Sequence, residues 1–415
     1  MDLLNVATAG SVDDGKSTLI GRLLYESKAI HDDQLDALAR ASARNGASNG
    51  HLDLALLTDG LRAEREQGIT IDVAYRYFAT ATRRFTIADT PGHAQYTRNM
   101  VTGASNADVA VILVDARKGL SEQSRRHAVL SALLGVRHLT LVVNKMDLVA
   151  FDKGAFDTIA GEFRAFAARL AVDDVVCIPT SALEGDNVVE RSDRAPWYEG
   201  PTVLGHLEAL PVDHDLSTVG ARLPVQWVVR PDAGFRGYAG TLVGGPLRVG
   251  DAVVVLPAGL PTRVTSIGAS SGPVEVAGAG AAVTVTVADD IDISRGDLLC
   301  GADDPPAVTA SIDAVVCWMA GAPLAPGRRY HLKHTTRWCR AVVEAVEYRL
   351  DVVSAGRVPA PAELGLNEIG GVTLATSVPL ALDRYRRNRV TGSFILVDDA
   401  NATVGAGLVG GFPGG

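Results

Sequence analysis

The pattern of apolar and polar positions divides the chain into two regions of different architecture. In the first region, short apolar runs alternate with longer segments whose apolar residues recur with the period of a helix, as at 121–134 and 155–170. This alternation predicts an α/β domain with a mostly parallel sheet over residues 1–212. The predicted strands are residues 3–9, 73–78, 85–89, 109–115, 139–144 and 175–180.

The second region has the texture of an all-β structure. Residues 211–223 are polar and rich in turn-forming residues, which predicts a linker. Beyond them, Val, Thr and Ile alternate with frequent Gly and Pro, as in 223–230, 238–242 and 251–256. This pattern predicts a barrel or sandwich over 213–304. A second β unit begins near Pro305 and extends to residue 415, and its last residues, GGFPGG, predict a mobile end or a linker remnant.

Composition narrows the class of protein. The 415 residues are 47% hydrophobic and 21% charged, as in soluble globular proteins. A net charge of −9 argues against a broad nucleic-acid-binding surface. Because no apolar run is long enough to span a bilayer and no signal-peptide pattern precedes the first strand, we expect a cytoplasmic protein. The cysteines form no C-x-x-C pair, which indicates free thiols in a reducing compartment; they are Cys177, Cys300, Cys317 and Cys339.

A phosphate-loop pattern, G-x-x-x-x-G-K-[ST], lies between the first predicted strand and a predicted helix. Glycines let the backbone curl so that successive N–H groups point at phosphate oxygens, and the helix adds the positive end of its dipole. Lys16 brings a charge to the outer phosphates, and the Ser17 hydroxyl ligates Mg²⁺. The alternative is a glycine-rich turn before an ordinary helix. The order of strand, glycine-rich loop and helix favours the phosphate loop over this alternative. The predicted loop residues are Gly10, Ser11, Val12, Asp13, Asp14, Gly15, Lys16, Ser17 and Thr18.

The sequence D-T-P-G-H at 89–93 follows another predicted strand. The Asp89 carboxylate can hold Mg²⁺ through water, and the Gly92 N–H can reach the terminal phosphate. Taken alone, Asp-x-Pro-Gly is also a common turn. Together with the phosphate loop it predicts that these residues surround the outer phosphate: Asp89, Thr90, Pro91, Gly92 and His93.

Motifs after the later strands select the base. The Asp147 carboxylate of N-K-x-D can accept hydrogen bonds from guanine N1–H and N2–H₂, donors that adenine lacks. An adenine nucleotide would leave that charge unpaired, which would cost several kcal/mol of binding free energy. The Lys145 stem can lie along the base, and the Ala182 N–H can bond guanine O6. The predicted base-site residues are Asn144, Lys145, Met146, Asp147, Ser181, Ala182 and Leu183.

In this order the motifs resemble those of translation-factor-type GTPases. Residues 66–71 resemble the first switch of that class, which implies that Thr70 ligates Mg²⁺ together with Ser17 and Asp89. The D-T-P-G-H motif is similar to the second switch, which implies that His93 positions the attacking water. The resemblance thus assigns GTP hydrolysis to Lys16, Thr70 and His93. Residues 237–257 resemble the first barrel of the class, so the implied fold is a P-loop GTPase domain at 1–212 followed by β-barrels at 213–304 and 305–415.

Within this class, the chain is most similar to the large, GTPase subunit of bacterial sulfate adenylyltransferase, from Asp2 to about Val409. Asp14 stands where elongation factors typically carry His, and Val397 where they usually carry Arg. The resemblance implies a hetero-oligomer in which GTP·Mg²⁺ hydrolysis drives the formation of adenylylsulfate and pyrophosphate from ATP and sulfate on a small catalytic subunit. Some family members are fused to an adenylylsulfate kinase. No second phosphate loop follows Ser17, so the chain is either the unfused form or a fused protein cut near its linker.

An elongation-factor-like carrier of aminoacyl-tRNA is the alternative function. A cluster of arginines favours it mildly, although a solvated loop explains the cluster as well. The net charge and Val397 count against it. The arginines are Arg384, Arg386, Arg387 and Arg389.

Asp147 should set the preference for guanine. We expect Asp147→Asn to weaken GTP binding and to improve the binding of xanthosine triphosphate, whose extra carbonyl can accept from the new amide. Titration of both nucleotides against wild type and variant measures the change. An unchanged preference would remove Asp147 from the base site.

Overall fold

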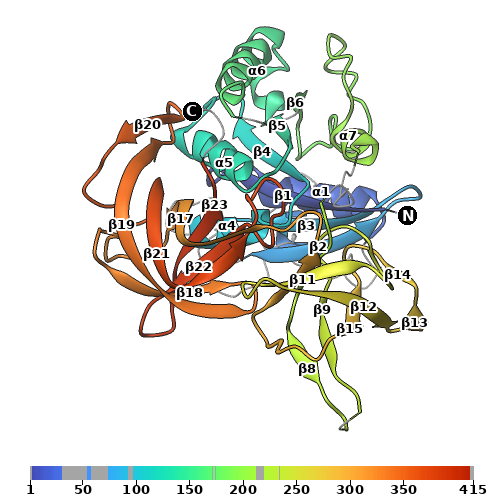
Figure 1. The fold of residues 1–415 in the computed structure, drawn as a ribbon. Helices are drawn as coiled ribbons and strands as arrows, with labels where there is room; N and C mark the ends of the chain where they lie inside the picture. Colours follow the sequence, from blue (N-terminus) through green and yellow to red (C-terminus); the bar gives the residue numbers. More distant parts are fainter. Residues whose placement is uncertain are drawn as a thin grey trace. The chain divides into compact units, whose positions relative to one another are not determined.

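The computed structural model describes residues 2–29, 54–57, 73–91, 97–170, 172, 174–211, 219–232 and 234–411. By its internal contacts, the chain divides into two compact units (Figure 1). The first holds Met1–Val212 with the short segment Asp351–Gly356, and the second holds Asp213–Leu350 and Arg357–Pro413. The first unit carries a mostly parallel sheet with helices, and the second consists of β-structure.

The first unit is built on a six-stranded sheet with the order β2-β3-β1-β4-β5-β6. Neighbouring strands run parallel except β2, which is antiparallel to β3. Parallel strands are buried on both faces, so they are apolar without alternation, as in β4, which is buried at every position. The strands are β1 (Leu3–Gly10), β2 (Ala74–Ala79), β3 (Arg84–Asp89), β4 (Val109–Asp115), β5 (His138–Asn144) and β6 (Asp174–Pro179).

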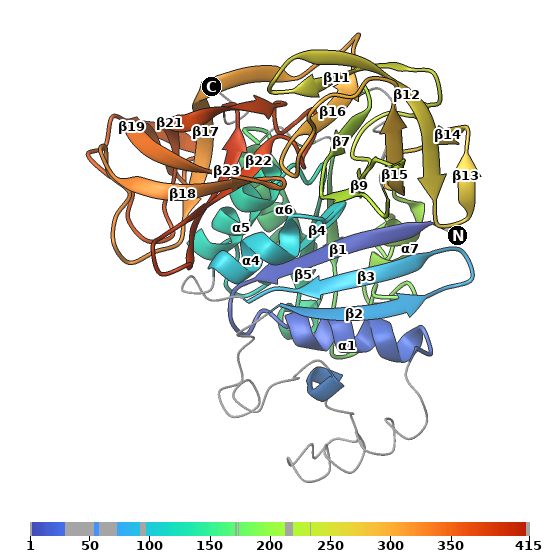
Figure 2. The ribbon, with the colours of Figure 1, turned by 60° about the horizontal axis from the view of Figure 1, so that its bottom comes forward.

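Helices cover both faces of this sheet. Figure 2 shows α1 and α4 on opposite sides of β1, β2 and β3. Helices α1 and α7 contribute Leu19 and Leu207 to the core that contains Val111 of β4. The helices are α1 (Lys16–Glu26), α4 (Thr97–Ala104), α5 (Glu122–Leu133), α6 (Lys153–Ala167) and α7 (Val203–Ala209), with 3-10 turns η1 (Leu54–Leu57) and η3 (Met146–Val149). None of the helices in the described ranges is both long and apolar enough to cross a bilayer.

Helix α6 begins two residues earlier than the periodicity at 155–170 predicts. The reason is its N-cap: the Asp152 carboxylate accepts hydrogen bonds from the N–H groups of Gly154 and Ala155, at 3.2 and 3.1 Å. Side-chain oxygens at this position satisfy helix donors that have no intrahelical acceptor. The local capping signal therefore outweighs the apolar period in setting where the helix starts.

The first part of the second unit forms an eight-stranded sheet with the path β7-β16-β11-β12-β15-β9-β8, on which β13 pairs with β12. Its inward-facing residues form one core, which includes Tyr238, Val255 and Val285. A small separate ladder pairs β10 with β14. The strands are β7 (Arg222–Pro224), β8 (Trp227–Val229), β9 (Gly237–Thr241), β10 (Leu247–Arg248), β11 (Ala252–Leu256), β12 (Leu260–Ala269), β13 (Gly272–Val274), β14 (Val276–Ala277), β15 (Ala282–Val287) and β16 (Leu298–Gly301).

The second part of this unit is a closed barrel. Strand β18 pairs with both β22 and β19, so the path β18-β22-β23-β17-β21-β19 returns to its first strand. Closure leaves these strands without a free edge on which another chain could pair. The strands are β17 (Ala307–Trp318), β18 (Arg329–His334), β19 (Arg337–Asp351), β21 (Ile369–Leu382), β22 (Ser393–Val397) and β23 (Thr403–Val409), with β20 (Gly356–Pro359) beside β19. The predicted fold class, an α/β domain with a mostly parallel sheet followed by β-barrels, is confirmed.

The prediction of a linker over 211–223 is wrong at its end. Arg222 and Leu223 belong to β7, which pairs with β16, and residues 212–218 of the linker lie outside the described range, as do 412–415 of the predicted mobile end. The alternating pattern at 223–230 covers two strands, because the chain changes partner between β7 and β8. A charged residue inside a strand hides the alternation of the pattern, and Arg222 is fully buried.

The burial of Arg222 is explained by a paired carboxylate. Its Nε donates to Asp383 Oδ2 at 3.0 Å and its Nη2 to Oδ1 at 3.2 Å, which joins β7 to the segment after β21. Asp383 is 3% exposed, and the Thr391 hydroxyl donates to the same carboxylate at 2.7 Å. A planar guanidinium forks onto a carboxylate with two bonds, so this pair fixes orientation as well as distance.

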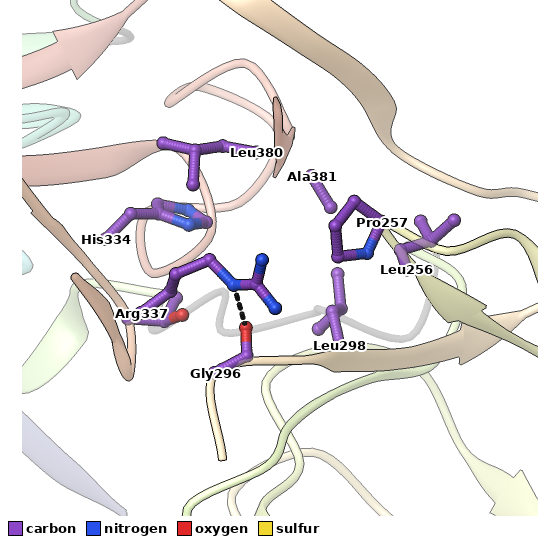
Figure 3. Close-up of a pocket in the computed structure, with 9 residues that line it drawn as sticks. Leu256, Pro257, Gly296, Leu298, His334, Arg337, Leu380 and Ala381 are labelled. Atoms are coloured by element: carbon purple, nitrogen blue, oxygen red, sulfur yellow. Dashed lines mark hydrogen bonds between the residues drawn. The ribbon is translucent and has the colours of Figure 1, made fainter. Parts of the chain in front are cut away.

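A small cavity lies among strand ends of the same unit (Figure 3). Arg337 Nε donates to the Gly296 carbonyl at 2.9 Å, and His334 Nε2 donates to the Thr391 carbonyl at 2.9 Å. The apolar lining comes from Leu256, Pro257, Leu298, Leu380 and Ala381. Its free volume of about 10 Å³ accommodates about one water molecule, so it excludes a nucleotide.

Removing one partner of the buried pair should destabilise the second unit strongly. Arg222→Met leaves the Asp383 charge buried without its cation, which should cost about 3–5 kcal/mol of the free energy of unfolding. Arg236→Met is the matched control, because its partners Asp290 and Asp292 are 95% and 91% exposed and such pairs contribute about 1 kcal/mol or less.

Denaturant titration of the full chain, followed by tryptophan fluorescence, measures both losses. Trp227, Trp318 and Trp338 all report on the second unit. Equal losses of unfolding free energy in Arg222→Met and Arg236→Met would contradict the expectation that burial of the Arg222–Asp383 pair sets its contribution.

Candidate nucleotide-binding site

The predicted motifs gather at one edge of the parallel sheet. The phosphate loop follows β1, Asp89 ends β3, Asn144 ends β5 and Ser181 follows β6. Carboxyl ends of parallel strands meet at one edge of a sheet, where α/β folds bind their ligands. The topology thus brings together residues that are more than a hundred positions apart in sequence. Thr70, Gly92 and His93 lie outside the described residues.

Two glycines give the loop its course. Gly10 has φ 151°, and a Cβ there would lie 2.8 Å from the Leu113 carbonyl oxygen. Gly15 has φ 93°, in the left-handed region, and a Cβ there would lie 2.3 Å from Asn144 Nδ2. Glycine reaches these conformations without steric cost, and here the neighbours also leave no room for a side chain. Both motif glycines are therefore required by geometry.

The loop divides its backbone donors into two groups. The Ser11 N–H donates to Asp14 Oδ2 at 2.7 Å, and the Gly10 N–H donates to His127 Nδ1 at 3.0 Å. Of the N–H groups that follow, that of Asp14 donates to the Ser11 carbonyl at 3.4 Å, and several others up to the start of α1 have no acceptor among the described residues. A curled run of unbonded N–H groups at a helix N-terminus is an anion site. These donors belong to Asp13, Gly15, Lys16, Ser17 and Thr18.

Lys16 lies inside the loop. Its Nζ donates to the carbonyl oxygens of Gly10 and Ser11 at 2.9 and 3.0 Å, and the residue is 7% exposed. Burial lowers the pKa of the Lys16 ammonium, and the nearby carboxylates of Asp89 and Asp14 oppose that shift. Burial likewise raises the pKa of the Asp14 carboxyl. Carboxylates thus help to keep the Lys16 ammonium charged inside the loop, although burial disfavours the charged form. A charged ammonium is the form that attracts phosphate.

The predicted metal side is built from oxygen donors. Asp89 is 2% exposed at the end of β3, and the Thr8 hydroxyl donates to its Oδ1 at 3.4 Å. Thr90 is buried and its hydroxyl donates to the Thr8 carbonyl at 2.6 Å, which fixes the backbone after Asp89; Pro91 is buried too. Hydroxyl and carboxylate oxygens suit Mg²⁺, which keeps several waters and binds few protein ligands. The residues present fit that ion, although no cluster of His, Cys, Asp and Glu forms a metal cage in the described part of the chain.

Asn144 connects the phosphate loop to the base loop. Its Nδ2 donates to the Asp14 carbonyl at 2.8 Å, and its Oδ1 accepts from the Ala182 N–H at 2.9 Å. The Ala182 N–H, predicted to bond guanine O6, is therefore engaged by Asn144 in this structure. The Leu183 N–H has no acceptor among the described residues. The side chain of Leu183 is 47% exposed beside this loop.

The other residues of N-K-x-D have distinct surroundings. Lys145 takes a left-handed conformation, φ 61°, and its Nζ contacts the Asp13 carbonyl and, at 3.1 Å, Asp115 Oδ2. Met146 is fully buried, so its side chain anchors the motif in the core. Asp147 is half-buried in η3. The lysine stem is therefore held across the loop, and the aspartate keeps access to solvent.

Sequence reasoning missed Asp115 and His127 as parts of this site. Asp115 ends β4, and hydrogen bonds from Arg117 and Lys145 hold the pKa of its carboxyl well below its usual range. Its place at a strand end, like that of Asp89 and Asn144, is the signal that could have found it. His127 lies within α5, where the sequence offers no such signal. Burial, with Lys16 and Arg126 nearby, lowers the pKa of His127 to about 3.

Comparison with known proteins agrees with this geometry. Residues 1–223 match the family model of the elongation factor Tu GTP binding domain, and residues 311–410 match the family model described as GTP-eEF1A C-terminal domain-like. "Bifunctional enzyme CysN/CysC" of Mycobacterium tuberculosis is 59% identical over 98% of this chain, and the protein of the same name from Xylella fastidiosa is 56% identical over 98%. "Sulfate adenylyltransferase subunit 1" of Aeromonas hydrophila is 53% identical, again over 98%.

The chain spans 67% and 65% of the length of the two bifunctional relatives and 86% of the Aeromonas protein. These names do not favour the elongation-factor-like alternative.

Asn144→Ala should uncouple the phosphate and base loops. It leaves the Asp14 carbonyl and the Ala182 N–H buried without partners, which should cost about 1–3 kcal/mol of stability for each group and weaken GTP binding at least about tenfold. Isothermal titration and denaturant unfolding measure the two effects.

Asn388→Ala is the matched control, because Asn388 is equally buried in the second unit, donates to the Val243 carbonyl and accepts from Val390 and Thr391. It should lose stability and retain GTP affinity. An Asn144→Ala chain with wild-type affinity would contradict the coupling.

Proposed function

We propose that this chain, which belongs to the sulfate adenylyltransferase subunit 1 family, binds and hydrolyses GTP as the GTPase subunit of such an enzyme. The observation that carries the proposal is the run of unbonded backbone N–H groups around the Lys16 ammonium at the start of α1. A single anion with several oxygens, such as a nucleotide phosphate chain, can satisfy these donors together.

The residues of the site divide the work on the nucleotide. The loop N–H groups cradle the phosphates, and Lys16, whose ammonium has a third N–H beyond the two that the Gly10 and Ser11 carbonyls accept, donates to the outer ones. Ser17 and Asp89, with Thr70, would hold Mg²⁺, which neutralises phosphate charge when bound. His93 orients the attacking water. Thr70 and His93 take these roles from the family resemblance, because both lie outside the described residues.

Recognition of guanine rests on Asp147 and the loop after β6. The Asp147 carboxylate accepts from N1–H and N2–H₂ of the base, and a backbone N–H of Ala182 or Leu183 donates to O6. Lys145 lies along the base, held by Asp115 and by the Asp13 carbonyl. A carboxylate that must remain paired rejects adenine, which offers it no donors.

The reaction served by GTP hydrolysis is the formation of adenylylsulfate and pyrophosphate from ATP and sulfate. The name "subunit 1" carried by the Aeromonas relative supports a second, catalytic subunit as the partner, with which this chain forms a hetero-oligomer. The nucleotide-transfer site lies on that partner. Joining sulfate to an adenylyl group is unfavourable, so the complex must discriminate GTP from GDP to pass free energy between the reactions. Use of ATP and GTP, and the four buried free thiols, suit the cytoplasm.

The proposal predicts coupled turnover. The chain alone should hydrolyse GTP slowly, at roughly 10⁻⁴–10⁻² per second, as GTPases without a supplied transition-state group do. A family small subunit with ATP and sulfate should accelerate this turnover. Sulfate-dependent pyrophosphate release should rise with GTP and fall strongly with a non-hydrolysable GTP analogue. One assay measures the phosphate released from GTP and the pyrophosphate released from ATP.

Lys16→Ala provides the control, since it should abolish GTP binding and stimulation while leaving assembly with the small subunit intact. GTP turnover indifferent to the small subunit, ATP and sulfate would overturn the sulfate assignment. Stimulation by ribosomes in the same assay would instead support a translational function.

A further inference from the structure

The first residue of the phosphate loop is held from outside the loop. The Gly10 N–H donates to Nδ1 of His127, a fully buried residue of α5, at 3.0 Å. The direction of this N–H is set by the backbone, because Gly10 has φ 151° and packs against the Leu113 carbonyl. A buried N–H without an acceptor costs free energy. Here His127 of α5 supplies the acceptor and removes that cost.

The imidazole is a neutral acceptor. Burial, together with the charges of Lys16 and Arg126, lowers the pKa of His127 to about 3, so the ring carries no charge near neutral pH. With Nδ1 accepting from Gly10, the ring proton resides on Nε2, which lies 2.8 Å from the side-chain amide of Gln123. The Gln123 atom at that distance is Nε2, itself a donor, so the carboxamide turned by about 180° about its last bond presents the Oε1 that accepts this proton. Gln123 thereby holds the tautomer in which Nδ1 is free to accept.

The same peptide group connects His127 to the loop cation. The Gly10 N–H is bound by His127, and the Gly10 carbonyl accepts from Lys16 Nζ at 2.9 Å. The next residue is held by α5 as well, since the Ser11 hydroxyl lies 2.8 Å from that of Ser121, the N-cap of the helix. Side chains of α5 therefore form hydrogen bonds with Gly10 and Ser11, the two residues whose carbonyls accept from Lys16.

We propose that His127 is a positioning residue of the phosphate site, acting through Gly10 on the carbonyls that hold Lys16. The inference rests on the proposed function, because the site it tunes is the GTP site. His127 does not touch the nucleotide; it sets the orientation of the Gly10 peptide and hence the place of the ammonium charge. Because its hydrogen-bond partners are Gly10 of the loop and Gln123 of α5, and neither belongs to the base site, it governs affinity for phosphates and leaves base selection alone.

Two substitutions separate the acceptor from the volume of the ring. His127→Leu fills the space without an acceptor, and His127→Asn places an oxygen near the position of Nδ1. Ser131→Ala is the matched control on the same helix, since the Ser131 hydroxyl is buried and makes no hydrogen bond within the described structure. The affinities of full-length protein for GTP, GDP and xanthosine triphosphate are measured by titration, and GDP release by stopped flow.

We expect His127→Leu to weaken GTP and GDP about tenfold or more and to speed GDP release, with the ratio of GTP to xanthosine triphosphate affinity unchanged. His127→Asn should recover most of the loss, and Ser131→Ala should match wild type. A His127→Leu chain within twofold of wild type would overturn the proposal, as would His127→Asn being as impaired as His127→Leu.

A measurement on the unmodified protein decides the case if His127→Leu does not fold. Nitrogen-15 spectra of wild type should show His127 as the Nε2–H tautomer with Nδ1 as acceptor, and slow hydrogen exchange at the Gly10 amide. The opposite tautomer, or a Gly10 amide that exchanges at the rate of an open loop, would overturn the proposal. Wild-type protein that fails to bind GTP would instead refute the proposed function.

Discussion

The buried side chain of Asn144 is the interaction on which the nucleotide site depends. A parallel sheet brings strand ends to one edge, but the loops beyond those ends have no ladder to hold them in register. A carboxamide both donates and accepts, so Asn144 can bond the Asp14 carbonyl of one loop and the Ala182 N–H of another. Aspartate could not donate and alanine could do neither. The absence of a Cβ on Gly15 lets this amide approach the loop.

Charge in the site is arranged before any phosphate is present. The Lys16 ammonium rests on the carbonyls of Gly10 and Ser11, and Lys145 rests on Asp115 and the Asp13 carbonyl. Each cation is thus held by neutral or anionic oxygen atoms, which limits the desolvation cost of burial. Preorganised charge saves the free energy of rearranging side chains when a ligand binds. The loop can therefore present a positive field in an otherwise acidic protein.

The second unit uses buried charge differently. Arg222 and Asp383 are both enclosed, and their bidentate pair joins β7 to the segment following β21. Such a pair contributes little net stability over apolar residues of the same shape, but each partner excludes arrangements that leave the other unpaired. We infer that the pair specifies how the strands of this unit meet. The apolar cluster of Leu256, Leu298, Cys300 and Ala381 supplies packing beside it.

The sequence by itself determined the order and type of the main elements and the position of each nucleotide motif. Those features follow from local patterns: apolar runs such as β4, glycines that permit the loop, and polar residues directly after strands. Only the tertiary structure decided that Arg222 belongs to a strand, that Asn144 engages Ala182, and that His127 holds Gly10. Each of these depends on contacts between residues far apart in the chain. A local pattern cannot reveal which buried polar group will meet which, because that choice is made by the packing of the whole unit.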